Sequence, residues 1–381
     1  MSMTPATSRA AVLVERGKPL EIRDVPIPRE LEPGAILVHN KVATICGTDV
    51  HVWEGSLGAD RKLPTVLGHE MIGEVAVLGP GVTCDSMGQK LCVGDRITWN
   101  QGQCGQCYFC VVEREPTLCV NWRGYMVGDC REYPHLVGGF SEYTYVYPSS
   151  DRIKIPDDVS DALAAASSCA LRMVIAAFER AGPLCEHHTV VVQGAGPVGL
   201  FSAAKALAQG VARVFVIGGP AERLKLAEEW GAVAISIDAH RNAEDRLAIV
   251  RDATGGRGAD LVIEAAGVPA AFSEGIDLLR RGGRYVIVGQ AHAESASFNP
   301  SAILFKHLTI IGSVGAHIRH YHRAFEFLRH NADRFDWSRM LSNVYPLDDI
   351  MTAMERMAQW KEIKPVIDLR SQIPKAAGET C

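Results

Sequence analysis

Between residues 189 and 313 the chain alternates short, almost uninterrupted apolar runs with stretches of helical periodicity, and no other feature limits its fold as much. The apolar runs are TVVVQ, VARVFVIG, AVAISI, ADLVIEA, GRYVIVG and HLTIIGS. Helical stretches such as GLFSAAKALAQG and AERLKLAEEWG separate most of them. Strands without polar positions are typical of a parallel sheet that helices cover on both faces. The segment therefore predicts an α/β domain with a doubly wound parallel sheet.

The rest of the chain predicts a second domain in two pieces. Residues 9–150 alternate short apolar runs with Gly, Pro and Asp turns, which favours a mostly antiparallel β domain. After about residue 317 the chain becomes helical and ends in KPVIDL, a piece too short for its own core. We expect this piece to return to the β domain. The predicted domains are residues 1–170 with 317–381, and residues 171–316.

Composition excludes several classes of function. The 39 basic and 44 acidic side chains leave a formal charge of −5, which gives no reason to expect a nucleic-acid partner. No apolar run reaches the roughly 20 residues that span a bilayer, so we expect no membrane partner. The first ten residues, MSMTPATSRA, lack an apolar signal core. The expected location is the cytoplasm.

A glycine-rich turn follows the first of the apolar strands. Gly194, Gly196 and Gly199 form a G-x-G-x-x-G pattern around Pro197 and Val198, between a β-branched strand and a helix. The three glycines permit a tight turn, close approach of a pyrophosphate and close packing of helix on strand. The helix N-terminus then presents free N–H groups to the phosphates. The pattern predicts a dinucleotide site, and a tight turn without a ligand is the alternative.

The end of the second strand leaves the identity of the dinucleotide open. An acid at this position normally binds the adenosine ribose diol, but here the strand ends at Gly218, followed by Gly219 and Pro220. The absence of this acid removes one obstacle to NADP, yet neither Gly219 nor Pro220 has a basic side chain that could hold a 2′-phosphate. Arg223, one turn into the next helix, can reach a ribose or a phosphate. We expect NAD, with NADP as the alternative.

The eleven cysteines indicate metal binding more than disulfides. Four of them, Cys104, Cys107, Cys110 and Cys119, lie within sixteen residues and offer a closed tetrahedral shell for a structural Zn²⁺. Redox dithiols or scattered buried cysteines are the alternatives. A dispersed set of Cys46, His69 and Cys169 matches the ligands of an alcohol-oxidising zinc site with one open position. The cysteines without an assigned role are Cys84, Cys92, Cys130, Cys185 and Cys381.

Together these motifs resemble those of a known family. The segments CGTDVH, GHE, CGQC-x-x-C…C, SSCAL and GAGPVG, in this order, are similar to the zinc-dependent medium-chain dehydrogenase/reductase family of alcohol dehydrogenases. The resemblance extends from about residue 9 to about residue 370. It implies a discontinuous catalytic domain built on a GroES-like β-barrel, a Rossmann domain, and an active site in the cleft between them. It also implies a homodimer or homotetramer, for which HLTIIGS is a candidate pairing strand.

The resemblance assigns roles around the catalytic zinc. The catalytic zinc would be held by Cys46, His69 and Cys169. Together with the structural zinc, this gives two zinc ions per chain. Asp49 would fix the ring of His69 from behind, as ligating histidines usually require. Glu70 would lie behind the metal and assist ligand exchange, or it would only form a buried ion pair.

Proton transfer and further cofactor contacts are also implied by the resemblance. Thr48 would hydrogen-bond the alcohol, and His51 would complete a proton relay to solvent through the nicotinamide ribose. A solvated surface histidine is the alternative for His51. The further cofactor contacts would come from Ala266, Val288, Gly289, Gln290 and Lys364. For Lys364 a contact with the pyrophosphate and an ordinary solvated side chain are both open.

The sequence determines the substrate less well than it determines the metal and cofactor sites. An apolar pocket would favour a secondary, cyclic or aromatic alcohol, although core packing is an equal alternative for the residues concerned. These residues are Trp53, Leu57, Trp99, Trp122 and Tyr125. The leading hypothesis is a zinc-dependent alcohol dehydrogenase that transfers hydride to or from NAD(P). A polyol or sugar dehydrogenase, a zinc-free reductase and a non-catalytic member of the same fold are the alternatives.

Overall fold

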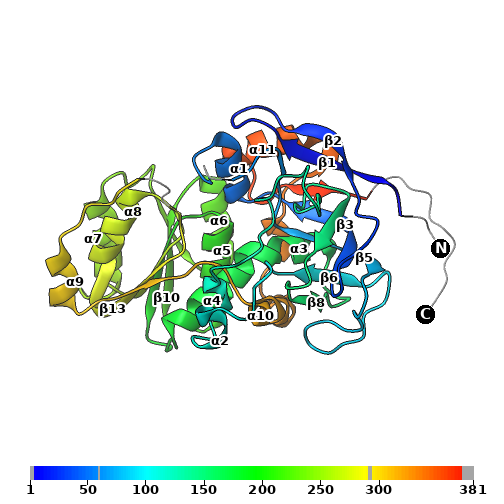
Figure 1. The fold of residues 1–381 in the computed structure, drawn as a ribbon. Coiled ribbons are helices and arrows are strands. Elements are labelled where there is room, and N and C mark those ends of the chain that lie inside the picture. Colours follow the sequence, from blue (N-terminus) through cyan, green and yellow to red (C-terminus); the bar gives the residue numbers. More distant parts are fainter. Residues whose placement is uncertain (1–3, 59–60, 291–293, 371–381) are drawn as a thin grey trace. The chain divides into compact units, whose positions relative to one another are not determined.

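The structure is a computed structural model, and it describes the chain except residues 1–3, 59–60, 291–293 and 371–381 (Figure 1). Cys381 therefore lies outside the described residues. The chain divides into two compact units. The first unit is built from Met1–Cys169, Ala316–Arg329 and Met340–Cys381, and the second from Ala170–Gly315 and His330–Arg339.

The second unit is a six-stranded parallel sheet in the order β11-β10-β9-β12-β13-β14. Its strands are β9 (Thr189–Gln193), β10 (Arg213–Gly218), β11 (Val233–Ser236), β12 (Ala259–Glu264), β13 (Leu279–Ile287) and β14 (Thr309–Gly312). The central strands β9 and β12 are buried at every position, as expected for apolar runs that helices cover on both faces. The doubly wound parallel sheet is confirmed.

Helices cover both faces of this sheet, and Figure 1 shows α5 and α6 opposite α7 and α8. The helices are α4 (Arg172–Ala181), α5 (Pro197–Ala208), α6 (Ala221–Glu229), α7 (Ala243–Ala253), α8 (Pro269–Leu278), α9 (Pro300–Lys306) and the single turn η3 (Trp337–Met340). Because each crossover returns the chain to the same edge, the loops after β9, β10 and β11 all lie at the carboxyl ends of the strands. Ligands of such sheets bind at this edge.

The first unit is mainly antiparallel, as its alternating sequence predicts. A seven-stranded sheet has the order β15-β16-β3-β5-β6-β8, with β7 also paired to β3, and a three-stranded sheet has the order β2-β1-β4. The strands are β1 (Thr7–Leu13), β2 (Glu21–Pro26), β3 (Ile36–Thr44), β4 (Thr65–Val66), β5 (Met71–Leu78), β6 (Arg96–Trp99), β7 (Tyr143–Val146), β8 (Arg152–Lys154), β15 (Val344–Pro346) and β16 (Val366–Asp368). The expected mostly antiparallel β domain is confirmed.

The helices of the first unit are short and lie mostly beside the sheets. They are α1 (Gly47–Glu54), α2 (Tyr108–Val111), η1 (Pro116–Leu118), α3 (Asp161–Ala166), the π-helical turn η2 (Ser167–Leu171), α10 (Ile318–His330), η4 (Leu347–Asp349) and α11 (Ile350–Ala358). The terminal strand β16 pairs with β3 in antiparallel fashion. This pairing explains why the C-terminal piece returns to the first unit.

Apart from shifts of one residue at Ala170 and Ala316, the division differs from the expected one at one segment. His330–Arg339 belongs to the second unit, although all of 317–381 was expected to return to the first. The cause is an aromatic cluster: the rings of Phe335 and Trp337 lie 5.5 and 5.7 Å from that of Trp230 at the end of α6. Burial of these large side chains holds the segment against the parallel-sheet unit.

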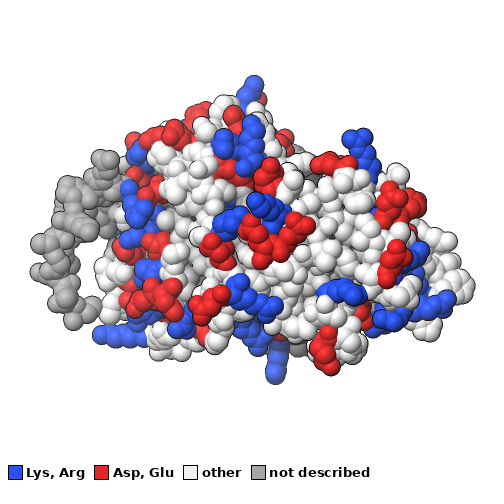
Figure 2. Space-filling model, turned by 180° about the vertical axis from the view of Figure 1, so that it is seen from behind, with Lys and Arg blue, Asp and Glu red and all other residues white. Residues whose placement is uncertain are grey.

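One continuous helical stretch among the described residues, Asp161–Ala181, is long and apolar enough to cross a membrane by length and composition. Most of it is buried inside the protein, as is usual for a core helix, so it is weak evidence for a membrane span. On the face shown in Figure 2, acidic and basic side chains are interspersed without a large area of one sign. That face therefore offers no extended basic footprint for nucleic acid.

Candidate active site and metal centres

Residues from three separate segments of the first unit form a candidate metal-binding cluster. The ligand atoms of Cys46, His69, Glu70 and Cys169 all lie within 4.8 Å of one another. Cys46 precedes α1, His69 and Glu70 precede β5, and Cys169 lies in the π-helical turn η2. A π-helical turn adds one residue to a helical turn and is frequent at functional sites. Here that turn carries a predicted ligand.

The chemistry of this donor set fits zinc. Two thiols and an imidazole are soft and borderline ligands of the kind that bind Zn²⁺ in catalytic sites. The pKa of Cys46 lies well below its usual value, because Cys169 hydrogen-bonds it and the charge of Lys364 favours the thiolate despite burial. A thiolate is the form that binds a metal. The three predicted catalytic-zinc residues are therefore brought together, and Cys46 is favoured as the thiolate.

Asp49 ties the two ligand segments to each other. Its Oδ1 lies 3.2 Å from Nδ1 of His69, and its Oδ2 accepts a 2.9 Å hydrogen bond from the backbone N–H of Cys46. The Gly68 N–H also donates to Asp49 Oδ1, at 3.2 Å. Because the carboxylate occupies Nδ1, the Nε2 atom of His69 is left for a metal. This is the position expected for a carboxylate behind a ligating histidine.

The two residues expected to move the proton lie on α1. The hydroxyl of Thr48 is 3.7 Å from Sγ of Cys46. His51 is three residues later, so both side chains lie on one side of the helix. The Nδ1 atom of His51 is 3.3 Å from the Ser56 hydroxyl, and the ring is half-buried. Both residues are thus close to the cluster in the fold, whereas their catalytic roles stay predictions.

Glu70 and Lys364 form a buried ion pair behind the cluster. The Lys364 Nζ atom lies 2.5 Å from Oε1 of Glu70, and the side chains are 1% and 0% exposed. Thr44 donates a 2.6 Å hydrogen bond to the same carboxylate. The alternative of a solvated Lys364 is therefore wrong, because its ammonium group is enclosed with a carboxylate. A contact between Lys364 and a pyrophosphate stays a prediction.

The second cluster consists of four cysteines that surround one point. The Sγ–Sγ distances are 3.5 Å for Cys107–Cys110 and for Cys104–Cys119, and 4.0 Å for Cys107–Cys119. Tetrahedral Zn–S bonds of about 2.3 Å place neighbouring sulfurs about 3.8 Å apart. The spacing fits a closed four-thiolate shell. Backbone hydrogen bonds, first from Gln106, lower the pKa of Cys104 to about 6, which favours the metal-binding thiolate.

In the second unit, the three glycines of the motif meet different requirements. Gly194 has a φ of +104°, which side chains other than glycine rarely adopt. A Cβ atom at Gly199 would lie 1.9 Å from the carbonyl oxygen of Gly194, so α5 can pack this closely only on glycine. A Cβ atom at Gly196 would meet no protein atom within 4 Å. The fold itself therefore does not demand glycine at 196, whereas an approaching pyrophosphate does.

The other predicted cofactor residues lie at the same edge of the sheet. A Cβ atom at Gly218 would come within 2.9 Å of the Ala195 N atom, which places the end of β10 against the glycine turn. The N–H groups of Ala266 and Gly267 donate to Glu264 Oε1 at 2.8 and 2.6 Å. Val288, Gly289 and Gln290 follow β13, and a Cβ atom at Gly289 would lie 2.5 Å from the Gly267 N atom.

Glu264 is a buried residue of this edge that the motifs did not single out. It ends β12, and burial raises the pKa of its carboxyl while the N–H groups of Gly267 and Ala266 oppose the shift. The signal was present in the sequence, as the acid that closes the apolar run ADLVIEA. Its contacts show that it holds the loops after β12 and β13 in place.

The five candidates for a substrate pocket do not behave alike. Trp99 and Tyr125 belong to the buried core, with ring centroids 6.3 Å apart, and Tyr125 lies 3.0 Å from the Ser150 hydroxyl. The core-packing alternative therefore describes these two. Trp122 is exposed, whereas Trp53 and Leu57 are half-buried at the margin of the core.

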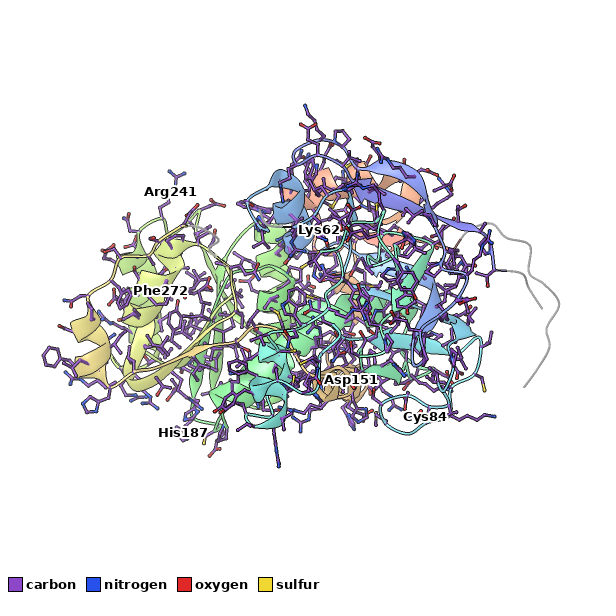
Figure 3. All side chains as sticks on the ribbon, viewed as in Figure 1. Lys62, Cys84, Asp151, His187, Arg241 and Phe272 are labelled. Atoms are coloured by element: carbon purple, nitrogen blue, oxygen red, sulfur yellow. The ribbon has the colours of Figure 1, made fainter. Side chains whose placement is uncertain are left out.

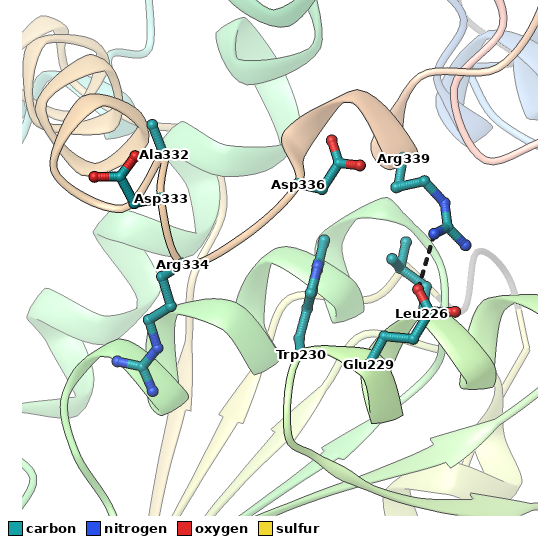
Figure 4. Close-up of a pocket in the computed structure, with 8 residues that line it drawn as sticks. All are labelled: Leu226, Glu229, Trp230, Ala332, Asp333, Arg334, Asp336 and Arg339. Atoms are coloured by element: carbon teal, nitrogen blue, oxygen red, sulfur yellow. Dashed lines mark hydrogen bonds and ion pairs between the residues drawn. The ribbon is translucent and has the colours of Figure 1, made fainter.

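A pocket in the second unit lies apart from the predicted chemistry. It is formed by α6 and the segment 332–339, and Figure 4 shows Arg339 reaching Glu229 across it. This ion pair has an N–O distance of 2.8 Å. The residues that line the pocket include none of the predicted ligands or cofactor contacts.

Comparison with known proteins matches both units. Two family models match the chain, "Zinc-binding dehydrogenase" over residues 197–330 and "Alcohol dehydrogenase GroES-like domain" over residues 32–157. The 5-exo-hydroxycamphor dehydrogenase of Pseudomonas putida is 34% identical, with 95% of this chain and 98% of that protein covered. The L-threonine 3-dehydrogenase of Bacillus subtilis is 30% identical, with 88% and 91% covered.

Two solved structures are similar over almost the full length. An alcohol dehydrogenase of Thermotoga maritima has a TM-score of 0.88 at 34% identity, covering 95% of this chain and 99% of its own. A zinc-binding dehydrogenase of Sinorhizobium meliloti, bound to NADP, has a TM-score of 0.81 at 28% identity. The alignment covers 96% of this chain and all of that one.

Proposed function

Because this chain belongs to the zinc-type medium-chain alcohol dehydrogenase family, whose members oxidise CH–OH groups, we propose that it interconverts a secondary, cyclic or aromatic alcohol and its carbonyl product with NAD(P). The observation that supports this most directly is the cluster of Cys46, His69 and Cys169, whose ligand atoms lie within 4.8 Å of one another. Two thiols and one imidazole leave a fourth position open on a tetrahedral metal. A substrate oxygen is the natural ligand for that position.

The metal residues would prepare an alcohol for oxidation. A zinc ion held there would supply Lewis acidity, which lowers the pKa of a hydroxyl group next to it. Asp49 keeps the His69 ring in one orientation and one tautomer. The buried pair of Glu70 and Lys364 adds one negative and one positive charge behind the ligands and leaves the local charge balanced. We propose that the four-cysteine cluster holds a second zinc with a structural role.

Proton removal falls to the residues of α1. Thr48, beside the thiolate of Cys46, would take up the proton of the substrate hydroxyl while it releases its own hydroxyl proton toward His51, so that it stays neutral. His51 would then pass a proton to solvent, and its hydrogen bond to Ser56 orients the ring. Imidazoles in general suit such a step, because histidine is the side chain that can take up and release a proton between pH 5 and pH 8.

The second unit would hold the dinucleotide. The nicotinamide ring supplies the hydride chemistry when it is bound. The open space at Gly196 and the N-terminus of α5 together suit a pyrophosphate, because unpaired N–H groups there favour a negative charge. The loops after β10, β12 and β13 would surround the rest of the cofactor.

The substrate class is proposed from the curated relatives. One is named for a hydroxycamphor, which is a cyclic secondary alcohol, and the other for L-threonine, whose hydroxyl is also secondary. Both names favour a secondary alcohol. Trp53 and Leu57, half-buried at the margin of the core, are the apolar candidates that remain for such a pocket, and we propose the cyclic kind over an amino acid or a polyol.

We also propose a homo-oligomer. The strand β14 lies at the edge of the six-stranded sheet, where its backbone groups can pair with a second copy. Exposed apolar side chains of Leu304, Phe305 and Val314 flank it. Light scattering coupled to gel filtration should give the mass of a dimer or a tetramer, and a monomeric mass would contradict this.

The proposed activity is tested by zinc analysis and an alcohol panel. The purified protein should contain two zinc ions per chain, and fewer would argue against the two-site assignment. Absorbance at 340 nm should rise with cyclic secondary or aromatic alcohols in the presence of NAD or NADP. A faster reaction with L-threonine or a polyol would replace the proposed substrate class. No change across alcohols and ketones would instead favour a non-catalytic protein.

A further inference from the structure

The loops that follow β10 and β11 lie side by side at the carboxyl edge of the parallel sheet. Gly218, the last residue of β10, is paired with Ser236, the last residue of β11. The N–H of Ile237 then donates a 3.0 Å hydrogen bond to the Gly218 carbonyl oxygen. This contact continues the pairing one residue beyond the strands.

Asp238 lies where the missing acid after β10 would be. A Cβ atom at Gly219 would be 3.9 Å from Oδ2 of Asp238. The Ser236 hydroxyl accepts hydrogen bonds from the N–H groups of Asp238 and Ala239, at 3.2 and 3.4 Å, so the loop is held in a turn. The Asp238 side chain is exposed and can reach a ligand. The carboxylate of Asp238, which follows β11, thus lies beside Gly219, where an acid would normally follow β10.

We propose that Asp238 replaces the absent acid and makes the enzyme select NAD over NADP. This inference rests on the proposed function, because it concerns the dinucleotide that the glycine motif would bind. In sheets of this type, the acid that follows the second strand accepts hydrogen bonds from the adenosine ribose. A 2′-phosphate would instead bring about −1.5 to −2 charges close to the same carboxylate. Like charges in proximity repel, so NADP would bind more weakly.

The nearby cations do not offset this repulsion. Arg223 is only 7% exposed, and desolvation lowers the pKa of its guanidinium group. A side chain buried to this degree offers little of its charge to a phosphate at the surface. Arg241, three residues after Asp238, projects outward from the second unit (Figure 3). Among the described residues, Asp238 is the charged side chain with an atom within 4 Å of a Cβ at Gly219.

Calorimetric titration of the zinc-loaded protein with NAD and with NADP tests the inference without requiring turnover. The parent should bind NAD at least tenfold more tightly than NADP. Asp238→Asn removes the charge and keeps the size, so it should shift the ratio of the two Kd values toward NADP by about tenfold. Asp238→Ser should shift the ratio in the same direction. Asp252→Asn, at the far end of α7, is the matched control and should change the ratio less than twofold.

The possible outcomes distinguish a failure of the role of Asp238 from a failure of the proposed function. A parent that binds NAD but whose ratio changes less than threefold in both Asp238 variants overturns the role of Asp238. A parent that prefers NADP overturns it as well. A parent that binds neither dinucleotide overturns the proposed function itself, and the inference falls with it.

Discussion

Lys364 and Glu70 form an ion pair that is almost fully enclosed, with the ammonium nitrogen 2.5 Å from Oε1 of the carboxylate. The two residues are 294 positions apart in the sequence. The pair joins the segment before β16 to the segment before β5, and it lies directly behind the predicted catalytic ligands. A buried charge is tolerated only when it is paired, so each residue depends on the other.

Removal of one partner should therefore be costly. Lys364→Met leaves Glu70 buried without a counter-charge and should lower the free energy of unfolding by about 3–5 kcal/mol. The double variant Glu70→Gln with Lys364→Met should recover at least half of this loss. Urea denaturation followed by circular dichroism measures both. Lys62→Met is the control, because its pair with Glu132 is exposed and should contribute about 0–1 kcal/mol. Equal losses in the single and the double variant would contradict the coupling.

Cys46→Ser should abolish turnover and leave the fold largely intact. A serine hydroxyl is a poor ligand for zinc, and serine is close to cysteine in size, so the packing at the start of α1 should be little disturbed. Metal analysis should show the loss of one zinc per chain. The control is Cys84→Ser, since Cys84 is exposed on the loop between β5 and β6 (Figure 3). Near-normal activity in Cys46→Ser would show that the catalytic-zinc assignment is wrong.

Cys107→Ser should instead reduce stability. The lobe that contains residues 104–119 has little regular structure of its own, so the metal supplies much of its folding free energy. A loss of about 2 kcal/mol corresponds to a Tm lower by about 4–8 °C for a domain of this size. Differential scanning calorimetry with zinc analysis checks both effects. A Tm equal to that of the parent would argue against a structural metal.

The features that could be predicted from the sequence are those with a local signal. The apolar runs of β9 and β12 and the spacing of the four clustered cysteines each lie within a few residues of chain. The dispersed residues Cys46, His69 and Cys169 are uninformative one by one, and only the combined donor set, supported by the resemblance, indicated a zinc site. The structure then placed their donor atoms together.

The features that could not be predicted depend on contacts between distant segments. The position of Lys364 in KPVIDL gives no sign that its partner is Glu70. The sequence therefore could not show whether the Lys364 side chain is solvated or buried. The packing of Phe335 and Trp337 on Trp230 is likewise a long-range contact, which is why the boundary near 330 differed from expectation. Very short strands such as β4 are stabilised by pairing more than by their own composition.

Substitutions at Gly196 and Gly199 should separate binding from stability. Gly196→Ala adds a methyl group to open space and should leave Tm unchanged, yet it should weaken NADH binding at least tenfold because the methyl occupies the path of the pyrophosphate. Gly199→Ala adds the same group 1.9 Å from a carbonyl oxygen and should lower Tm as well. Thermal unfolding and fluorescence titration with NADH measure the two properties. Normal NADH binding by Gly196→Ala would contradict the site.

His39 provides a test of acid sensitivity away from both metal clusters. It lies on β3 against the ring of Tyr143, with centroids 4.8 Å apart, and its Nε2 atom is buried with no hydrogen-bond partner among the described residues. Burial lowers the pKa of His39 below 6.5, although Glu74 and Glu142 oppose the shift. The imidazole is therefore neutral in the folded protein over a range in which the unfolded chain already binds a proton.

The direction of the pH effect follows from this difference in proton binding. Stability is fully present above the unfolded pKa of about 6.5 and is lost as the pH falls through the lowered pKa of the folded state. His39→Gln cannot take up this proton, so its urea midpoint should fall less between pH 7 and pH 5 than that of the parent. His187→Gln removes an exposed imidazole and should keep the parent's difference between the two pH values. Because acid release of zinc affects all three proteins alike, an identical fall in His39→Gln and the parent would show that His39 is not the group responsible.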